Sequence, residues 1–458
     1  MRKLCFFLIF ALLLQVPTKV QVHAFININS PSAVLMDQGT GNVLFAQNEH
    51  ERLYPAGLTK MLTAIIVLDY LDPQDIIVVG NEIASVPQGA IRAGHQVGEY
   101  ITVHNLLRAL MIHNGNDSGM ILALHAVRAQ RNNNAVPIAS AEGLFAQLMN
   151  ERASELGAYN THFVNPNGLH HDEHVTTAFD LALIARAFID IPLLREIAAR
   201  TEFIGNSLYG YLGEVSENVR TIEHHWQDNN ELMIGGNYHY IYARGIRSGN
   251  TTQSGACLAA SAQRNGVELI AIVLNSSDPA RWQDTRILFE YGFATYAYHQ
   301  IVEENQFMDT ISVYYAMRGG PTTVDVVSLE GFEALFNQDE LTRLERSLNF
   351  YETYYELPYK SYYTLHAPVE HGDIVGYVTY SLDGQLLFRS SLISVGEIEA
   401  RTWDSDMDYY IDLFMDTVFS VSALPFWLGA AGILIGIAGV YFAITERRRN
   451  RNTWSIRR

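Results

Sequence analysis

Lys60 lies in an apolar segment with helical periodicity, and its surroundings suggest acyl-transfer chemistry. One class of serine enzymes holds a nucleophile and its base together as Ser-x-x-Lys, because helix positions three apart share a face. In the segment Tyr54–Thr63, the position three residues before Lys60 is Gly57. Glycine has no hydroxyl group, so no acyl-enzyme can form at this position. The sequence therefore keeps a base and lacks the nucleophile that the base would serve.

Two other hydroxyl groups are close enough in the sequence to be considered as substitutes. Thr59 directly precedes Lys60 and so faces about 100° away from it around the helix. Ser118 follows a second polar motif, Asn114-Gly115-Asn116-Asp117, but belongs to a different element. We expect neither residue to replace the missing nucleophile, although an altered hydrolytic mechanism stays open as an alternative.

Histidine-rich segments raise the possibility of metal chemistry. Residues 170–174 read His-His-Asp-Glu-His, and a metal-activated water could in principle replace a serine. A polar surface loop explains the same run, and the pair His224-His225 is equally typical of a solvated loop. We therefore expect no metal ion and no cofactor.

The N-terminal residues have the pattern of a secretory signal peptide. Arg2 and Lys3 precede the apolar run 4–16, and a small residue, Ala24, stands at the expected cleavage site. The apolar run is too short to span a bilayer comfortably. We assign residues 1–24 to the signal peptide.

The C-terminal residues predict a membrane span. Residues 424–444 carry no charge and are numerous enough to cross about 30 Å of hydrocarbon. Six arginines follow within residues 445–458, and the positive-inside rule places such a tail in the cytoplasm. The region between the signal peptide and residue 424 would then be extracellular or periplasmic, as the ectodomain of a single-pass cell-membrane protein.

Charge and cysteine content limit the possible partners of this ectodomain. The 458-residue chain has a formal net charge of −18, and the ectodomain is more acidic still because the C-terminal tail is basic. A strongly acidic exterior argues against nucleic acid or anionic lipid as a partner. Cys5 would leave with the signal peptide, so the mature chain keeps only Cys257 and can form no internal disulfide.

Hydrophobic patterning predicts two folded regions between the termini. In the first, residues 25–298, strand pairs at both ends enclose a helical middle, which indicates one α/β domain. The expected strands are 33–37, 43–47, 256–262 and 267–274, and the expected helices are 58–71, 106–113, 117–128, 142–156 and 177–189. The second, residues 299–394, has short strand-like runs and predicts a small β-rich domain. Residues 395–423 are acidic and partly amphipathic, and we interpret them as a juxtamembrane stalk.

Several ordered motifs give the chain a resemblance to a known family. Pro55-Ala56-Gly57-Leu58-Thr59-Lys60-Met61 resembles the first motif of the penicillin-binding D-alanyl-D-alanine carboxypeptidases, with glycine in the serine position. Asn114-Gly115-Asn116-Asp117 resembles their second motif, and Gly245-Ile246-Arg247-Ser248-Gly249 their Gly-Ile-Lys-Thr-Gly strand. The segments 165–169, 174–182 and 367–376 also match in order. The resemblance covers nearly the whole ectodomain and implies a penicillin-binding, β-lactamase-like fold, with a sheet flanked by helices.

The resemblance also implies a role for each matching position. Lys60 would be the base, and Asn114 replaces a serine that would relay a proton, which an amide cannot do in the same way. Asn116 would orient a substrate amide. Arg247 would keep a positive charge for a substrate carboxylate, with a geometry different from that of lysine. Ser248 and Gly249 would complete the substrate-binding strand.

The resemblance implies an enzyme that removes the terminal D-alanine of peptidoglycan stem peptides. With Gly57 at the nucleophile position, we expect an inactive or impaired homologue that binds a stem peptide ending in D-Ala-D-Ala, or a cell-wall protein. Two alternatives remain: an active carboxypeptidase with altered chemistry, and a structural partner of the wall-synthesis machinery.

Overall fold

The computed structural model describes residues 26–210, 219–351, 355–357, 360–362, 365–420 and 424–454. The expected signal peptide, residues 1–24, lies outside the described residues. The chain divides into two compact units, Met1–Tyr298 and His299–Arg458. Each unit is described by itself.

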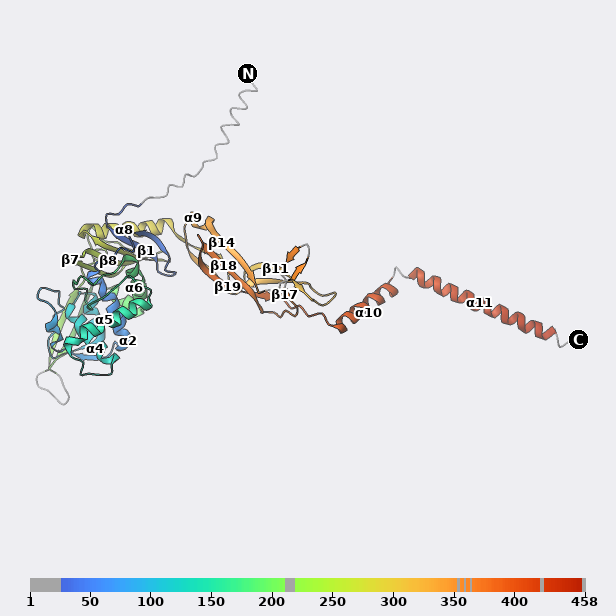
Figure 1. The fold of residues 1–458 in the computed structure, drawn as a ribbon, viewed down its shortest axis with the longest axis horizontal. Coiled ribbons are helices and arrows are strands. Elements are labelled where there is room, and N and C mark those ends of the chain that lie inside the picture. The colour runs from blue at the N-terminus through green and yellow to red at the C-terminus, as the bar shows by residue number, and fades with distance from the viewer. Residues whose placement is uncertain are drawn as a thin grey trace, which may run out of the picture. The chain divides into compact units, whose positions relative to one another are not determined.

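A five-stranded antiparallel sheet forms the centre of the first unit (Figure 1). Its strand order is β2 (Val43–Gln47), β1 (Ser32–Asp37), β9 (Val267–Ser276), β8 (Gly255–Arg264), β7 (Ala243–Thr251). N- and C-terminal segments thus pair within one sheet, as the sequence predicts. Helices cover both faces, so β1 is buried along its whole length.

The helices of this unit are placed by caps and by apolar faces. They are α2 (Lys60–Tyr70), α3 (Val103–Met111), α4 (Asn116–Gln130), α5 (Ile138–Glu155), α6 (Ala178–Asp190), α7 (Pro192–Ala198) and α8 (Asp278–Thr295). Helix α8 lies on one face of the sheet and α6 on the other (Figure 1). The Thr177 side chain accepts a hydrogen bond from the Asp180 backbone N–H and so begins α6. Residues 60–67 of α2 are all buried, so α2 is the central helix of the unit.

Two hairpin turns have the conformation that their sequences predict. Asn265 and Gly266, between β8 and β9, have φ values of 52° and 84°. Asp383 and Gly384, in the second unit, have φ values of 52° and 85°. Asn-Gly and Asp-Gly pairs are favoured in such turns because both residues must adopt positive φ.

A second sheet in the first unit was not predicted from the sequence. It joins β3 (Ile76–Val78), β4 (Glu99–Thr102), β5 (Glu202–Tyr209) and β6 (Arg220–Gln227) in that order. The pair His224-His225 lies in β6, so the interpretation as a solvated loop was wrong. Because neighbouring residues of a strand face opposite ways, His224 is buried and His225 is exposed.

The second unit is β-rich, as predicted. Its six-stranded sheet has the order β14 (Leu344–Phe350), β18 (Ile374–Leu382), β19 (Gln385–Val395), β12 (Thr323–Ser328), β11 (Phe307–Tyr314), β17 (Leu365–His366). Strand β10 (Ala297–Val302) pairs with β13 (Phe332–Phe336), and β15 (Tyr355–Leu357) pairs with β16 (Lys360–Tyr362). A short helix, α9 (Gln338–Arg343), begins with a capping box at Asn337. Val326, Ala334, Val378 and Leu392 are at the centre of a separate core.

Two helices follow the β-rich region. The segment expected to be a stalk contains α10 (Trp403–Phe419), and α11 spans Leu424–Trp454. Residues Leu424–Arg448 of α11 have a mean hydropathy of 2.0 over their apolar window, with none of that window buried. This C-terminal helix is long and apolar enough to be consistent with membrane anchoring.

Candidate functional site

Gly57 lies in a short 3-10 helix, η1 (Ala56–Thr59), directly before α2. Ala56 has a φ of 48°, an unfavourable value for a residue with a side chain. A Cβ atom on Gly57 would be 3.1 Å from Asn114 Oδ1 and 3.1 Å from the Ser248 carbonyl oxygen. The position that would carry the nucleophile therefore points to the place where the three sequence motifs meet.

Lys60 lies directly below this point and is almost completely buried. Its Nζ donates hydrogen bonds to Asn116 Oδ1 at 2.9 Å and to the Asn167 carbonyl oxygen at 2.7 Å. Burial, together with the positive charge of Arg247, holds the pKa of the Lys60 ammonium well below its usual value, and Asp117 opposes this shift. A lowered pKa favours the neutral amine, which is the form of lysine that can act as a base.

A tight loop at residues 165–169 supplies the carbonyl that holds Lys60. Asn165 Oδ1 accepts hydrogen bonds from the backbone N–H groups of residues 167, 168 and 169. Gly168 has a φ of 76°, and a Cβ there would be 1.7 Å from the Ala56 carbonyl oxygen. Only glycine allows this loop to pack so closely against η1.

The second motif forms the wall opposite η1. Asn114 has a φ of 61°, and its Oδ1 is buried without a hydrogen-bond partner among the described residues. Asn116 is fully engaged, because its Oδ1 accepts from Lys60 and its Nδ2 donates to the Ile91 carbonyl oxygen at 2.9 Å. Asn114 thus offers a free acceptor, whereas Asn116 has none to spare.

Strand β7 closes the third side of the site. A Cβ on Gly249 would be 2.6 Å from the Gly57 backbone nitrogen, so glycine is required for this close approach. Ser248 Oγ donates a hydrogen bond to Asn229 Oδ1 at 2.7 Å. The structure therefore brings together the seven predicted site residues, from Gly57 to Gly249, around one point.

Arg247 points into the protein from β7 and is 1% exposed. Its Nη1 donates to the Met111 carbonyl oxygen, its Nε donates to the Ser248 carbonyl oxygen at 2.9 Å, and Asp228 Oδ1 is 3.7 Å from its Nη1. Burial raises the pKa of Asp228, and the charge of Arg247 opposes that shift. A carboxylate could reach this guanidinium only by displacing one of these contacts.

Neither substitute hydroxyl faces the site. Thr59 is buried, and its Oγ1 is 2.9 Å from His174 Nε2. Because His174 Nδ1 accepts a hydrogen bond from the Val164 backbone N–H, the ring proton lies on Nε2 and is donated to Thr59. Ser118 is also fully buried, with its Oγ 2.9 Å from His95 Nε2.

The run at residues 170–174 is only partly the surface loop that the sequence suggested. His171 and Asp172 are exposed, but His174 is 1% exposed and packs against Phe163. Burial and the nearby cationic groups lower the pKa of His174 to about 3. His174 is therefore a neutral, internal residue that supports η1 through Thr59.

Sequence reasoning missed the contribution of the segment after β6. Asp228 and Asn229 contact the side chains of Arg247 and Ser248, yet they belong to no recognisable motif. The only available signal was that Asp228 is acidic and could pair with Arg247. The sequence did not show that these two residues would meet.

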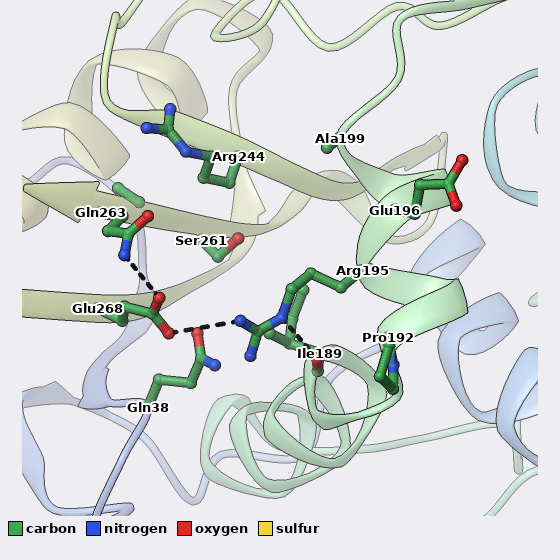
Figure 2. A pocket seen from close by; sticks show the side chains of 11 residues that line it. Gln38, Ile189, Pro192, Arg195, Glu196, Ala199, Arg244, Ser261, Gln263 and Glu268 are labelled. Carbon is green, nitrogen blue, oxygen red and sulfur yellow. Dashed lines mark hydrogen bonds and ion pairs between the residues drawn. The ribbon is translucent and has the colours of Figure 1, made fainter. Parts of the chain in front are cut away.

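A cavity of about 320 Å³ lies elsewhere on the first unit (Figure 2). It is lined by residues from α6, α7, β8 and β9, and across it Arg195 forms an ion pair with Glu268 at 3.8 Å. None of the seven predicted site residues lines this cavity. It is therefore separate from the Gly57 site.

Comparison with known proteins agrees with this geometry. Residues 18–278 match the family described as D-alanyl-D-alanine carboxypeptidase, and residues 296–400 match the C-terminal domain of penicillin-binding protein 5. The chain is 28% identical over 366 residues to D-alanyl-D-alanine carboxypeptidase DacF of Bacillus subtilis, covering 78% of this chain and 83% of that protein. It is 26% identical over 394 residues to DacC of Escherichia coli, covering 82% and 88%.

Solved structures confirm the predicted fold. Penicillin-binding protein 5 of Haemophilus influenzae superposes with a TM-score of 0.59 at 22% identity, covering 82% of this chain and 98% of that one. The Streptomyces K15 DD-transpeptidase superposes with a TM-score of 0.52 at 27% identity, covering 59% and 98%. The α/β unit has the fold of a penicillin-binding catalytic domain, and the chain belongs to the D-alanyl-D-alanine carboxypeptidase family of peptidoglycan metabolism.

Proposed function

We propose that this protein is a non-catalytic member of its family, which binds a peptidoglycan stem peptide ending in D-Ala-D-Ala at the outer face of the cell membrane. The site would recognise the peptide and hold it without forming a covalent bond. The degenerate site, and the roles of its residues, are part of this proposal.

The observation that carries the proposal is the contrast between Gly57 and its surroundings. Gly57 has no side chain that could act as a nucleophile. Lys60, in contrast, is buried, is hydrogen-bonded to Asn116 and Asn167, and has a lowered pKa. Loss of the nucleophile in a serine hydrolase lowers the rate by about a millionfold. Lys60 and its hydrogen-bond partners are thus retained, although the acylation step that they would support has lost its nucleophile.

Ligand binding is supported by the unpartnered amide oxygen at the site. A buried acceptor without a donor is unfavourable by roughly 1–3 kcal/mol, and a ligand N–H would remove that penalty. Asn114 Oδ1 is such an acceptor and lies 3.1 Å from the position of a Gly57 Cβ. A backbone amide of a stem peptide could donate to it.

The burial of Thr59 and Ser118 weighs against the alternative of an active hydrolase. Each hydroxyl is hydrogen-bonded to an internal histidine and points away from Gly57. Among the positions considered from the sequence, neither presents a nucleophile to a bound peptide.

The proposal includes an orientation in the membrane. Helix α11 would cross the bilayer, with the arginine-rich tail in the cytoplasm and residues 25–423 outside. This places the site on the side where peptidoglycan is found. Protease accessibility of the tail in intact cells, compared with opened cells, would test the orientation.

Calorimetry with the full-length protein in detergent tests the binding activity. The probes are a synthetic stem pentapeptide ending in D-Ala-D-Ala and its L-Ala-L-Ala stereoisomer, and free D-alanine is measured in the same samples. We expect saturable binding of the D,D-peptide, none of the L,L-peptide, and D-alanine release no greater than without protein. Asn114→Ala should weaken binding about fivefold, as expected for one hydrogen bond, and Asn237→Ala, at an exposed loop position, is the matched control.

The other outcomes point to the alternatives. Release of D-alanine above the background would establish an active carboxypeptidase with altered chemistry and contradict the proposal. Absence of both binding and release would leave the role of a structural partner of the wall machinery, in which the site is a relic.

A further inference from the structure

A second group of converging polar side chains contacts the residue after the second motif, Ser118, and involves the sheet that the sequence did not predict. His95, Glu99 and His224 come from the loop before β4, from β4 and from β6. One ligand atom from each lies within 4.8 Å of the others, and all three residues are buried. From this cluster, we propose that His95, Glu99 and His224 bind one divalent transition-metal ion, with zinc as the best match to the ligand set.

The chemistry of the three ligands suits zinc. Two imidazole nitrogens and one carboxylate oxygen are a common set of protein ligands for this ion, with a further position for a water molecule or another group. The hydroxyl of Ser207, on β5, is 2.8 Å from both Glu99 Oε1 and His224 Nε2. Metal-bound imidazoles are neutral ligands, so the carboxylate of Glu99 would offset one of the two charges of a divalent cation.

The distances between the ligand atoms also fit. His95 Nδ1 is 3.2 Å from Glu99 Oε1, and His224 Nε2 is 2.9 Å from the same oxygen. Ligands about 2.0–2.2 Å from a tetrahedral zinc ion are separated by about 3.3–3.6 Å. Side-chain rotations that lengthen these two distances by a few tenths of an ångström, and that bring the two imidazole nitrogens from within 4.8 Å of each other to the tetrahedral spacing, would admit the ion.

Hydrogen bonding alone satisfies this cluster poorly. Three donors, from His95, His224 and Ser207, converge on the single oxygen Oε1 of Glu99. A carboxylate oxygen has two lone pairs, so one of the three bonds must be weak.

The surroundings of the ligands resemble a supporting shell for a metal ion. The Gln96 backbone N–H donates to Glu99 Oε2 at 2.9 Å, and His95 Nε2 is 2.9 Å from Ser118 Oγ. Such contacts fix a ligand's orientation and leave its other atom free for the metal. The Trp226 ring stacks on His224, with 4.6 Å between ring centroids, and excludes water on that side.

The cluster is connected to the second motif, which gives a bound ion a structural role. Asp117 accepts hydrogen bonds from the backbone N–H groups of residues 93–95, and Ser118 contacts the His95 ring. An ion bound at His95 would therefore hold this loop against the start of α4, beside Asn116. The inference differs from the sequence-based expectation of no metal, and it does not depend on peptide binding at Gly57.

Metal analysis of the full-length protein in detergent tests the site. The protein is loaded with Zn²⁺ and dialysed, and its zinc content is measured by mass spectrometry of the element. We expect about one zinc ion per chain in the wild type, and at least a tenfold loss of bound zinc in Glu99→Gln and in His224→Asn. His225→Asn is the matched control, because it lies on the exposed face of the same strand and should keep full occupancy.

A second measurement on the wild type alone guards against variants that fail to fold. Co²⁺ should replace Zn²⁺ and produce the visible absorption of a tetrahedral nitrogen and oxygen site, and excess Zn²⁺ should abolish that absorption. Zn²⁺ at about a hundred times its dissociation constant should also raise the unfolding midpoint by on the order of 5 °C. Absence of stoichiometric zinc in the wild type, or equal zinc in the wild type and a folded Glu99→Gln variant, would overturn the proposal.

Discussion

Restoring a hydroxyl at Gly57 should restore covalent reaction with penicillin. In Gly57→Ser, the new Oγ would lie three residues before Lys60, whose lowered pKa makes it a base for this hydroxyl. The unpartnered Asn114 Oδ1 is close enough to accept from the serine. We therefore expect the variant to form an acyl-enzyme with a fluorescent penicillin, whereas the natural protein forms none.

The size of the gain follows from what the site still lacks. Restoring a nucleophile is worth about a millionfold in rate. Asn114 cannot relay a proton as a hydroxyl does, and such acid–base assistance is worth about 10²–10⁴. We therefore expect Gly57→Ser to be acylated about 10²–10⁴ times more slowly than a site with a complete proton relay, and Gly57→Ala to form no acyl-enzyme.

The same substitution should moderately destabilise the fold. The added Cβ would be 3.1 Å from the Ser248 carbonyl, which belongs to the backbone of β7 and cannot move freely. Overpacking of this kind costs about 1–3 kcal/mol, and the higher helix propensity of serine offsets about 0.5 kcal/mol. Gly57→Ala has the same crowding, so the comparison of the two variants isolates the hydroxyl.

The assay is the time course of fluorescent labelling, followed on a denaturing gel with full-length protein. Gly57→Ser/Lys60→Met is the third variant, and it should lose the label because it lacks the base. A folded Gly57→Ser protein that labels no faster than Gly57→Ala would refute the reasoning. Labelling of the natural protein would contradict the absence of a nucleophile.

Three further predictions concern the framework. Gly168→Ala should lower the free energy of unfolding by at least about 2 kcal/mol in denaturant titrations, because its Cβ would overlap the Ala56 carbonyl, and unchanged stability would contradict this packing. The pKa of His174 is about 3 in the folded protein and 6.5 in the unfolded chain. Its contribution to the free energy of unfolding is therefore complete above about pH 6.5 and is lost as the pH falls. Between pH 6.5 and 4.5 the free energy of unfolding should fall by about 2–3 kcal/mol. The free energy of unfolding of His174→Asn should therefore depend less on pH than that of the wild type or of a variant at exposed His239. An equal dependence would contradict the lowered pKa of His174. Burial raises the pKa of the Cys257 thiol to about 11, so iodoacetamide should label it only after unfolding, and rapid labelling of the native protein would argue against its burial.

Much of the first unit could be predicted because its signals are local. The Asn265-Gly266 turn, the apolar strands β8 and β9 and the helical period of α2 each have a direct sequence signature. The turn, the strands and the helix depend on residues that are neighbours in the chain. The meeting of the three distant motifs at Gly57 was expected only from their resemblance to a known family.

The parts that could not be predicted depend on pairing between distant segments. Strand β6 carries several charged and polar residues, and only Ile222, His224 and Trp226 alternate toward the interior. Its partner, β5, leaves Ile204 and Leu208 exposed and buries Ser207, so its apolar residues do not mark the buried face. The same reason explains why Asp228 and Asn229 were missed, because their contacts to β7 arise only after the second sheet has formed.

Gly57 also determines the timescale on which the site can hold a ligand. In an acyl-enzyme, occupancy ends when water hydrolyses the ester, so it is set by chemistry. On the proposed function, a ligand at Gly57 would leave by simple dissociation, so occupancy would follow the ligand's local concentration and its off-rate. A site of this kind would respond reversibly to the supply of its ligand and would not consume it.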